Sequence, residues 1–145
     1  MRTILAASFL FVASIVPGSA QDSGGIPDAM MAQVVSRILR YNFGPADDQR
    51  TIFIWAEGMK EDWLPRIRGR NFALRTAKAL EKDNIYSDRI YFFVPAVREG
   101  RHFKIGFGHG DPDCTNDGVW WNFRIVRGRV HLWIPTSQGW GSGCA

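Results

Sequence analysis

Apolar residues recur along this chain with two different periods, and each period predicts a different kind of element. After Pro27 the apolar positions follow one another at spacings of three and four residues: Met31, Val34, Val35, Ile38 and Leu39. This is the period of a helix with one buried stripe. Pro27 and Asp28 suit the first turn of that helix, and Gly44 followed by Pro45 ends it.

The next segments predict a short strand and a second helix. Thr51–Trp55 is rich in β-branched and aromatic residues, which favours a strand. Asn71 can cap a helix that continues to about Lys82, with Leu80 on its apolar side. The first half of the chain is therefore expected to hold two helices and one strand.

Alternation with period two predicts two β-hairpins in the C-terminal half. Residues 90–97 and 102–107 flank Glu99 and Gly100, which are expected to form the first turn. That register gives three facing pairs: Phe92 with Phe107, Val94 with Ile105, and Ala96 with Phe103. A turn at residues 127–128 gives the second set: Ile125 with Val130, Phe123 with Leu132, and Trp121 with Ile134. Each register gathers large apolar residues on one face.

The predicted fold class is α+β. It consists of an N-terminal helix, a short strand, a second helix and a four-stranded antiparallel β-meander, with the helices packed on one face. The chain has 145 residues, of which 46% are hydrophobic and 22% charged, and this composition is typical of one globular domain. We expect that domain to span residues 27–145 and to end in a Gly-rich tail.

The N-terminus has the pattern of a cleavable secretory signal peptide. A positive start at Arg2 precedes an apolar run over residues 4–16, and small residues follow up to Ala20. The run is shorter than the ~20 residues that span a bilayer, and no later stretch is apolar enough to do so. We therefore expect cleavage near Ala20, a flexible leader at residues 21–26, and a secreted or periplasmic protein without a transmembrane segment.

Two cysteines, Cys114 and Cys144, follow this predicted signal peptide. In an exported chain a pair of cysteines most simply forms one disulfide. A metal-binding or catalytic thiol is the alternative, but neither cysteine has a histidine close by in the sequence. We therefore expect one disulfide, which would tie the Gly-rich tail to the loop around Cys114.

The formal net charge is +4, and it is unevenly spread. Residues 65–80 and 119–135 contain cations and no acid, whereas residues 105–118 contain three acids and no cation. Such polarity attracts an anionic ligand or an acidic protein partner, and the segment from Arg66 to Arg75 is one candidate surface for that partner. Nucleic acid is an unexpected partner for an exported protein unless the protein is a nuclease. Ordinary solvated arginines are the alternative explanation.

One face of the predicted meander gathers aromatic and basic residues. Tyr91 and Phe93 are expected on this outward face, together with His102. We predict that its ligand-binding residues are Tyr91, Lys104, Trp120, Asn122, Arg124, His131 and Trp133. Exposed aromatic patches with polar neighbours are typical of binding sites. The alternative is that another element covers Trp120 and Trp133 as a second small core.

A small ribonuclease-like hydrolase that works without a metal is the alternative function. His102 and His131 would then act as general acid and base, with Glu57 as the candidate carboxylate. Nothing in the sequence places these three residues together, so a binding protein is the first expectation and an enzyme the second. The chain contains no motif for a cofactor, and we expect none.

The loop between the two hairpins carries the weak candidates for a metal site, namely Asp111, Asp113 and Asp117. Asp113, Asp117 and Gly118 match the start of a calcium loop, but Arg124 stands where the last carboxylate ligand is required. His109 with scattered carboxylates is a poor set of ligands for a transition metal. We therefore expect no metal site, because Gly, Pro and Asp also build ordinary turns.

Overall fold

The structure is a computed structural model that describes residues 25–44, 49–82, 90–110, 116–134 and 139–142. The elements, in chain order, are α1 (Asp28–Phe43), β1 (Thr51–Trp55), η1 (Glu61–Trp63), β2 (Asn71–Arg75), α2 (Ala77–Lys82), β3 (Ile90–Glu99), β4 (His102–Gly110), β5 (Asn116–Val126), β6 (Arg129–Trp133) and β7 (Gly139–Ser142). The helix α1 and the strand β1 lie where the sequence predicts them.

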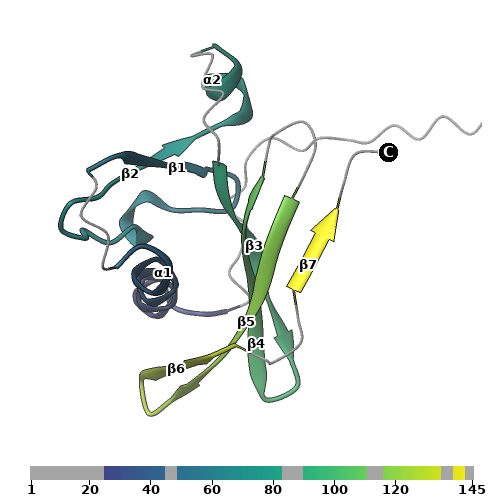
Figure 1. The fold of residues 1–145 in the computed structure, drawn as a ribbon. Helices are drawn as coiled ribbons and strands as arrows, with labels where there is room; N and C mark the ends of the chain where they lie inside the picture. Colours follow the sequence, from purple (N-terminus) through teal and green to yellow (C-terminus); the bar gives the residue numbers. More distant parts are fainter. Residues whose placement is uncertain (1–24, 45–48, 83–89, 111–115, 135–138, 143–145) are drawn as a thin grey trace, which may run out of the picture.

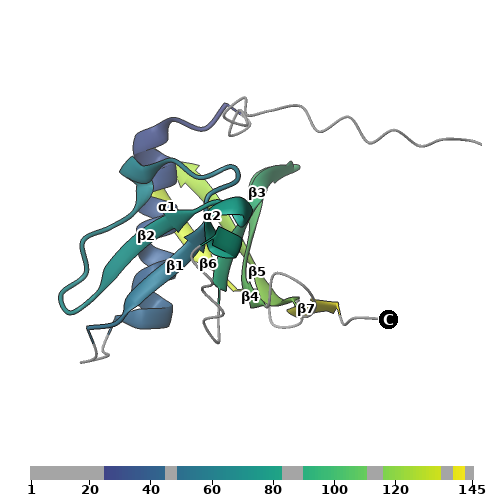
Figure 2. The ribbon, with the colours of Figure 1, turned by 90° about the horizontal axis from the view of Figure 1, so that it is seen from above.

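The described strands form one mixed, seven-stranded sheet. Its order is β2-β1-β3-β4-β5-β6, and β7 pairs with the part of β5 that β6 leaves free. The strand β1 runs parallel to both β2 and β3, whereas the neighbours from β3 to β6 are antiparallel. The sheet curls around α1 as a half-barrel, with β1 and β2 on one side of the helix and β6 on the other (Figures 1 and 2).

The predicted fold class is wrong, because the described chain is mostly sheet rather than a four-stranded meander with helices on one face. The largest difference is at residues 71–82, where one helix was expected. Asn71–Arg75 is instead a strand, and it pairs with β1 over its whole length, from Thr51↔Asn71 to Trp55↔Arg75. Parallel pairing with a strand twenty residues away overrides the local helical pattern, so only Ala77–Lys82 is helical.

The first hairpin also differs from the predicted register. Its last pair is Glu99↔His102, so residues 100–101 form the turn, and the register shifts between Val94 and Val97. This is a β-bulge, and it contains Pro95, which has no N–H to donate to the neighbouring strand. Beyond the bulge, Phe93 rather than Phe92 faces Phe107.

The second hairpin has the predicted register, except that β6 ends at Trp133, so the predicted pair of Trp121 with Ile134 is not formed. The pairs Asn122↔Trp133, Phe123↔Leu132, Arg124↔His131 and Ile125↔Val130 are all present. Arg127 and Gly128 form its two-residue turn, with φ angles of 51° and 70°. Positive φ at both central residues is the geometry of a type I′ turn, which matches the twist of the two strands that it joins.

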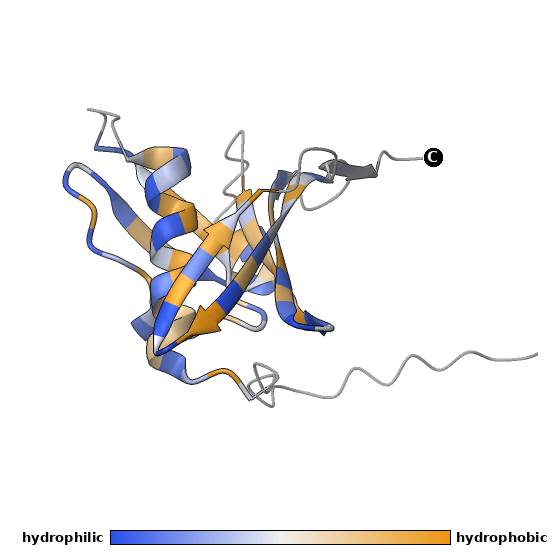
Figure 3. Ribbon diagram, turned by 90° about the horizontal axis from the view of Figure 1, so that it is seen from below, coloured by the Kyte–Doolittle hydropathy of each residue, from blue (hydrophilic) through white to orange (hydrophobic). Residues whose placement is uncertain are grey.

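The core fills the space between α1 and the curled sheet. Val34, Val35, Ile38 and Leu39 on α1 are completely buried, as their spacing predicts. Hydrophobic and hydrophilic positions are interspersed along α1 and along the strands (Figure 3). The Arg37 side chain spans the helix–sheet interface, since its Nη1 donates to the carbonyl oxygen of Val130 at 2.6 Å. This hydrogen bond ties α1 to β6.

Several sequence predictions lie outside the described residues. These are the signal peptide at residues 1–20 and both cysteines, Cys114 and Cys144. No disulfide is found among the residues that the structure describes. In that same part of the chain, no helix is long and apolar enough to cross a membrane.

Candidate ligand-binding cleft

The sheet has two faces with different surroundings, which we call inner and outer. The inner face packs against α1 and carries the odd-numbered residues of β4 and β5, such as Phe107 and Trp121. The outer face carries their even-numbered residues, such as Lys104 and Trp120. A strand sends successive side chains to opposite faces, so each register decides which residues share a surface.

A cleft of about 510 Å³ opens on the inner face between the C-terminal end of α1 and the strands β4, β5 and β7. Its walls are mostly aromatic and aliphatic, and include Tyr41, Tyr91, Phe107, Val119, Trp121, Ile134 and Trp140. The polar side chains along it are those of Asn42, His109 and Asp117. This volume and this mostly apolar lining are typical of small-molecule sites.

The apolar wall of the cleft faces solvent. Tyr41, at the end of α1, is 69% exposed and meets the buried Trp121 ring edge-on, with 5.1 Å between the ring centroids. Val119 and Ile134 are also among the exposed large hydrophobic residues. Apolar side chains that remain exposed in a concave place mark a binding surface more strongly than the same side chains scattered singly.

The polar residues of the cleft lie in one row across three strands. Tyr91 on β3 pairs with His109 on β4, which pairs in turn with Asp117 on β5. The rings of Tyr91 and His109 meet edge-on at a centroid distance of 5.9 Å. Neither His109 nor Asp117 forms a side-chain hydrogen bond or ion pair within the described part of the chain, so both present polar atoms to the cleft.

The helix α1 also supplies a polar residue to the cleft, Asn42, whose side chain is oriented by the helix backbone. The Asn42 side-chain Nδ2 donates to the carbonyl oxygen of Ile38 at 2.8 Å, which leaves its side-chain oxygen as an acceptor. Among the described residues that line the cleft, Asp117 alone carries a formal charge. The polar groups therefore offer one negative charge and more acceptors than fixed donors.

Glycines position β7 at the rim of the cleft. The Trp140 ring lies on the outer face against Gly108 and Gly118; a Cβ at Gly118 would overlap the ring, and one at Gly108 would lie 3.0 Å from it. Its ring centroid lies 5.4 Å from that of Phe92. Close packing of an indole on two glycines holds β7 beside β5, which places the backbone of Gly139 along the cleft.

The outer face carries six of the seven predicted ligand-binding residues. Lys104, Asn122 and Trp133 form one row across β4, β5 and β6, and Arg124 pairs with His131 in the next. Tyr91 and Phe93 were predicted on this face but lie on the inner one, where Phe93 pairs with Phe107 and is buried. The cause is the bulge at Pro95, which reverses the facing of the strand before it.

The aromatic residues of the outer face contact one another and a cation. The Lys104 Nζ lies 4.8 Å above the Trp120 ring, whose centroid is 6.3 Å from that of Trp140. The Trp120 side chain is accordingly half-buried, whereas Trp133 is 39% exposed and packs against His102 at 5.8 Å. Part of the predicted surface is therefore half-buried by contacts among its own side chains, and part of it faces solvent.

The residues proposed for a hydrolase are only partly brought together. His102 and His131 belong to the outer face, and the Nε2 of His102 lies 3.5 Å from a carboxylate oxygen of Glu99. Glu57 follows β1, which β3 separates from β4 in the sheet. The carboxylate near His102 is thus Glu99 rather than Glu57.

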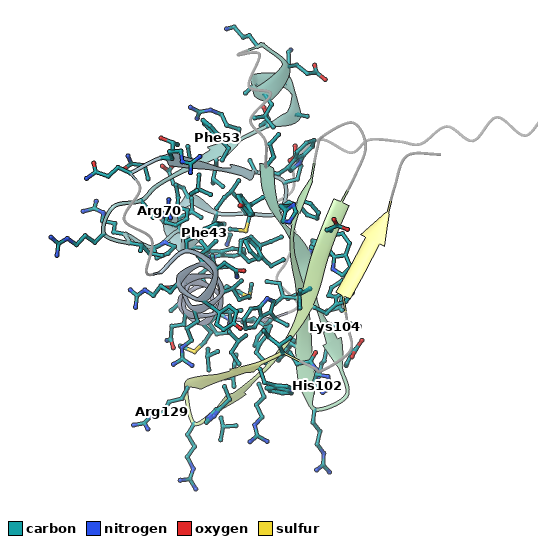
Figure 4. All side chains as sticks on the ribbon, in the orientation of Figure 1. Phe43, Phe53, Arg70, His102, Lys104 and Arg129 are labelled. Carbon is teal, nitrogen blue, oxygen red and sulfur yellow. The ribbon has the colours of Figure 1, made fainter. Side chains whose placement is uncertain are left out.

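The segment from Arg66 to Arg75, predicted as a surface for an acidic partner, is only partly exposed. In the segment from Arg66 to Arg75, the guanidinium groups of Arg70 and Arg75 lie over the rings of Phe43 and Phe53 at 6.0 and 5.7 Å (Figure 4). These two arginines therefore pack within the fold, while Arg66 is exposed.

Of the weak metal candidates, Asp117 lines the cleft, and Asp111 and Asp113 lie outside the described residues. The described residues contain no group of three or more His, Cys, Asp or Glu side chains placed to hold a metal ion.

Sequence reasoning missed the cleft. The alternation Phe107–His109 and Asp117–Val119–Trp121 is visible in the sequence and assigns these residues to one face of the sheet. Comparisons with protein families, with curated proteins and with solved structures found no match to this chain.

Proposed function

We propose that this protein binds a small, mostly apolar molecule that carries an N–H or cationic group, and that it holds this molecule in the cleft between α1 and strands β4, β5 and β7. The single observation that carries the proposal is the combination of exposed apolar walls with one carboxylate, Asp117, at the polar end. A binding protein of this kind is consistent with the export expected from residues 1–20.

The apolar walls supply affinity. A ligand that covers Tyr41, Val119 and Ile134 removes apolar surface from water at three exposed side chains, and each buried square ångström contributes about 25 cal/mol. The Tyr41 and Trp121 rings, which meet edge-on, also offer a flat ligand two aromatic surfaces. A flat aromatic or alicyclic molecule suits these walls best.

The polar end supplies selectivity. Asp117 accepts hydrogen bonds and repels anions, and the side-chain oxygen of Asn42 also accepts. An anionic ligand would bring its charge close to the Asp117 carboxylate, which forms no ion pair with any described residue, and this approach is unfavourable. The cleft therefore favours donors over anions, in contrast to the basic outer face.

A matched pair of fluorescent probes tests this proposal. N-phenyl-1-naphthylamine is apolar with one N–H, and 1-anilinonaphthalene-8-sulfonate is the same skeleton with an added anion. We expect the first probe to bind with increased emission and the second to bind at least about fivefold more weakly, because Asp117 repels the sulfonate. Stronger binding of the sulfonate would contradict the proposed polarity of the cleft.

A matched pair of variants locates the probe. Val119 and Val126 lie on the same strand and are 36% and 40% exposed, but only Val119 lines the cleft. We expect Val119→Trp to fill the cleft and weaken probe binding about tenfold or more, and Val126→Trp to leave it unchanged. Equal effects of the two variants, with both proteins folded by circular dichroism, would overturn the location.

A further inference from the structure

A second surface lies at the opposite end of strands β4 and β5 from the cleft. The turns of the β3–β4 and β5–β6 hairpins both lie at this end, since β4 begins beside Phe123, three residues before β5 ends. The two turns stand apart, and the β5–β6 turn projects toward the side of the sheet that holds α1 (Figure 1). We call residues 94–104 and 122–133 the tip surface. In Figure 4 it is the lower end of the molecule, where His102 and Arg129 are labelled.

The tip surface is strongly basic. Its cations are Arg98, Arg101, Lys104, Arg124, Arg127 and Arg129, and its one acid is Glu99. Glu99 is already engaged, since its two carboxylate oxygens lie 3.4 Å from the Lys104 Nζ and 3.5 Å from the His102 Nε2. The five arginines are exposed and outnumber any acid that could neutralise them within this surface.

Exposed apolar residues stand among these cations. Val97, Val126 and Trp133 are three of the six exposed large hydrophobic residues of the described chain, and all three belong to the tip surface. Val126 lies directly opposite Arg129, beside the turn. An anionic polymer would account for the cations of this surface. A partner with an apolar interior would also cover the exposed apolar side chains.

The β5–β6 turn holds Arg127 in an unusual backbone conformation. Arg127 has a φ of 51° at the first central position of the β5–β6 turn, where Asn, Asp or Gly is the usual residue. It is the one residue other than glycine with a positive φ among those that the structure describes. A cation is thus held at the outermost point of the hairpin in a conformation that a long side chain disfavours.

From these observations we infer that the tip surface docks on an anionic lipid bilayer. The arginines bind lipid phosphates, and Val126 and Trp133 enter the interface between head groups and acyl chains, where tryptophan is favoured. Docking through the tips leaves the cleft, at the far ends of β4 and β5, open to solvent. The inference concerns a separate surface and does not depend on the function proposed for the cleft.

Sedimentation of the full chain with vesicles tests this inference. We expect binding to vesicles of 30% phosphatidylglycerol in phosphatidylcholine, weak binding to phosphatidylcholine alone, and a loss of binding as salt rises. Reversal of two tip charges in Arg127→Glu/Arg129→Glu should weaken partitioning about tenfold or more. The matched control Arg66→Glu/Arg68→Glu reverses two other exposed arginines and should leave binding within about twofold.

Two outcomes would overturn the inference. If the tip variant and its control bind vesicles equally, another part of the chain, such as the apolar run at residues 4–16, makes the membrane contact. Val126→Ser separates a bilayer from a soluble polyanion, because it should weaken vesicle binding and leave binding to polyuridylic acid unchanged. If Val126→Ser changes neither vesicle binding nor polyuridylic acid binding, and polyuridylic acid binds as tightly as vesicles, the partner is a nucleic acid.

Discussion

Gly118 and Trp140 face each other on neighbouring strands, and the indole ring of Trp140 covers the glycine. A Cβ at Gly118 would lie 2.6 Å from the Cε2 of that ring, which is closer than two carbon atoms approach in folded proteins. The packing of β7 on the sheet therefore requires that residue 118 has no side chain. Because β7 also forms the rim of the cleft, a side chain at residue 118 would also change the shape of the binding site.

Gly118→Ala should displace Trp140 and β7. We expect the free energy of unfolding to fall by about 1–3 kcal/mol, as for other substitutions that overfill a packed interior. Gly139→Ala is the matched control on β7, because the nearest atom to its added Cβ would be 3.8 Å away. Urea unfolding measures both, and equal losses would show that close packing on Gly118 is not what holds β7.

Arg37→Ala should loosen the contact between α1 and β6. It removes the 2.6 Å hydrogen bond from the guanidinium to the carbonyl oxygen of Val130, and we expect a loss of about 1–2 kcal/mol. Arg40→Ala, one turn further along α1, removes an exposed arginine for which no such bond is present among the described residues. Thermal unfolding of the two variants compares them directly, and a smaller loss for Arg37→Ala than for Arg40→Ala would contradict the assignment.

Tyr41 and Phe43, two positions apart on α1, should have opposite effects. Phe43 is buried and meets Tyr91 edge-on at a centroid distance of 4.8 Å, so Phe43→Ala should cost about 3–5 kcal/mol of stability. Tyr41 is exposed in the cleft, so Tyr41→Ala should weaken naphthylamine binding and leave the unfolding midpoint nearly unchanged. Probe titration and urea unfolding on both variants provide the comparison. A stability loss without a binding loss in Tyr41→Ala would argue against the cleft.

Asp117→Asn should remove the charge preference of the cleft and keep its shape. We expect 1-anilinonaphthalene-8-sulfonate to bind about fivefold more tightly to this variant, because the repulsion between two negative charges is gone. Binding of N-phenyl-1-naphthylamine should change less. The ratio of the two dissociation constants is the measurement, and a ratio identical to that of the unaltered protein would remove Asp117 from the site.

The sequence pattern correctly predicted the elements whose conformation depends mainly on residues nearby in the chain. The stripe from Met31 to Leu39 is long and regular enough to specify α1. The turn at residues 127–128 specified the second hairpin, because alternation continues on both of its sides without interruption. The strand β2 was missed because its residues, Asn71–Arg75, contain no β-branched side chain, and their conformation depends on pairing with β1.

The candidate site was harder to predict than the fold, for two physical reasons. Pro95 creates a bulge, and one extra residue moves Tyr91 from the predicted outer face to the inner one. The cleft also combines Tyr41, at the end of α1, with residues of β4, β5 and β7 that follow it by more than sixty positions. Alternation within a strand shows which residues share a face, but it does not show what lies opposite that face.

The burial of α1 has a consequence for how the chain folds as it is made. The helix is the first described element, yet Phe123 and Val130, which help to cover its apolar stripe, are among the last to be synthesised. The bond from Arg37 to Val130 spans 93 positions. Contacts between such distant positions form slowly, so the stripe stays uncovered until nearly the whole chain has emerged. A newly made chain therefore exposes the apolar stripe of α1 to solvent until the last strands pack against it.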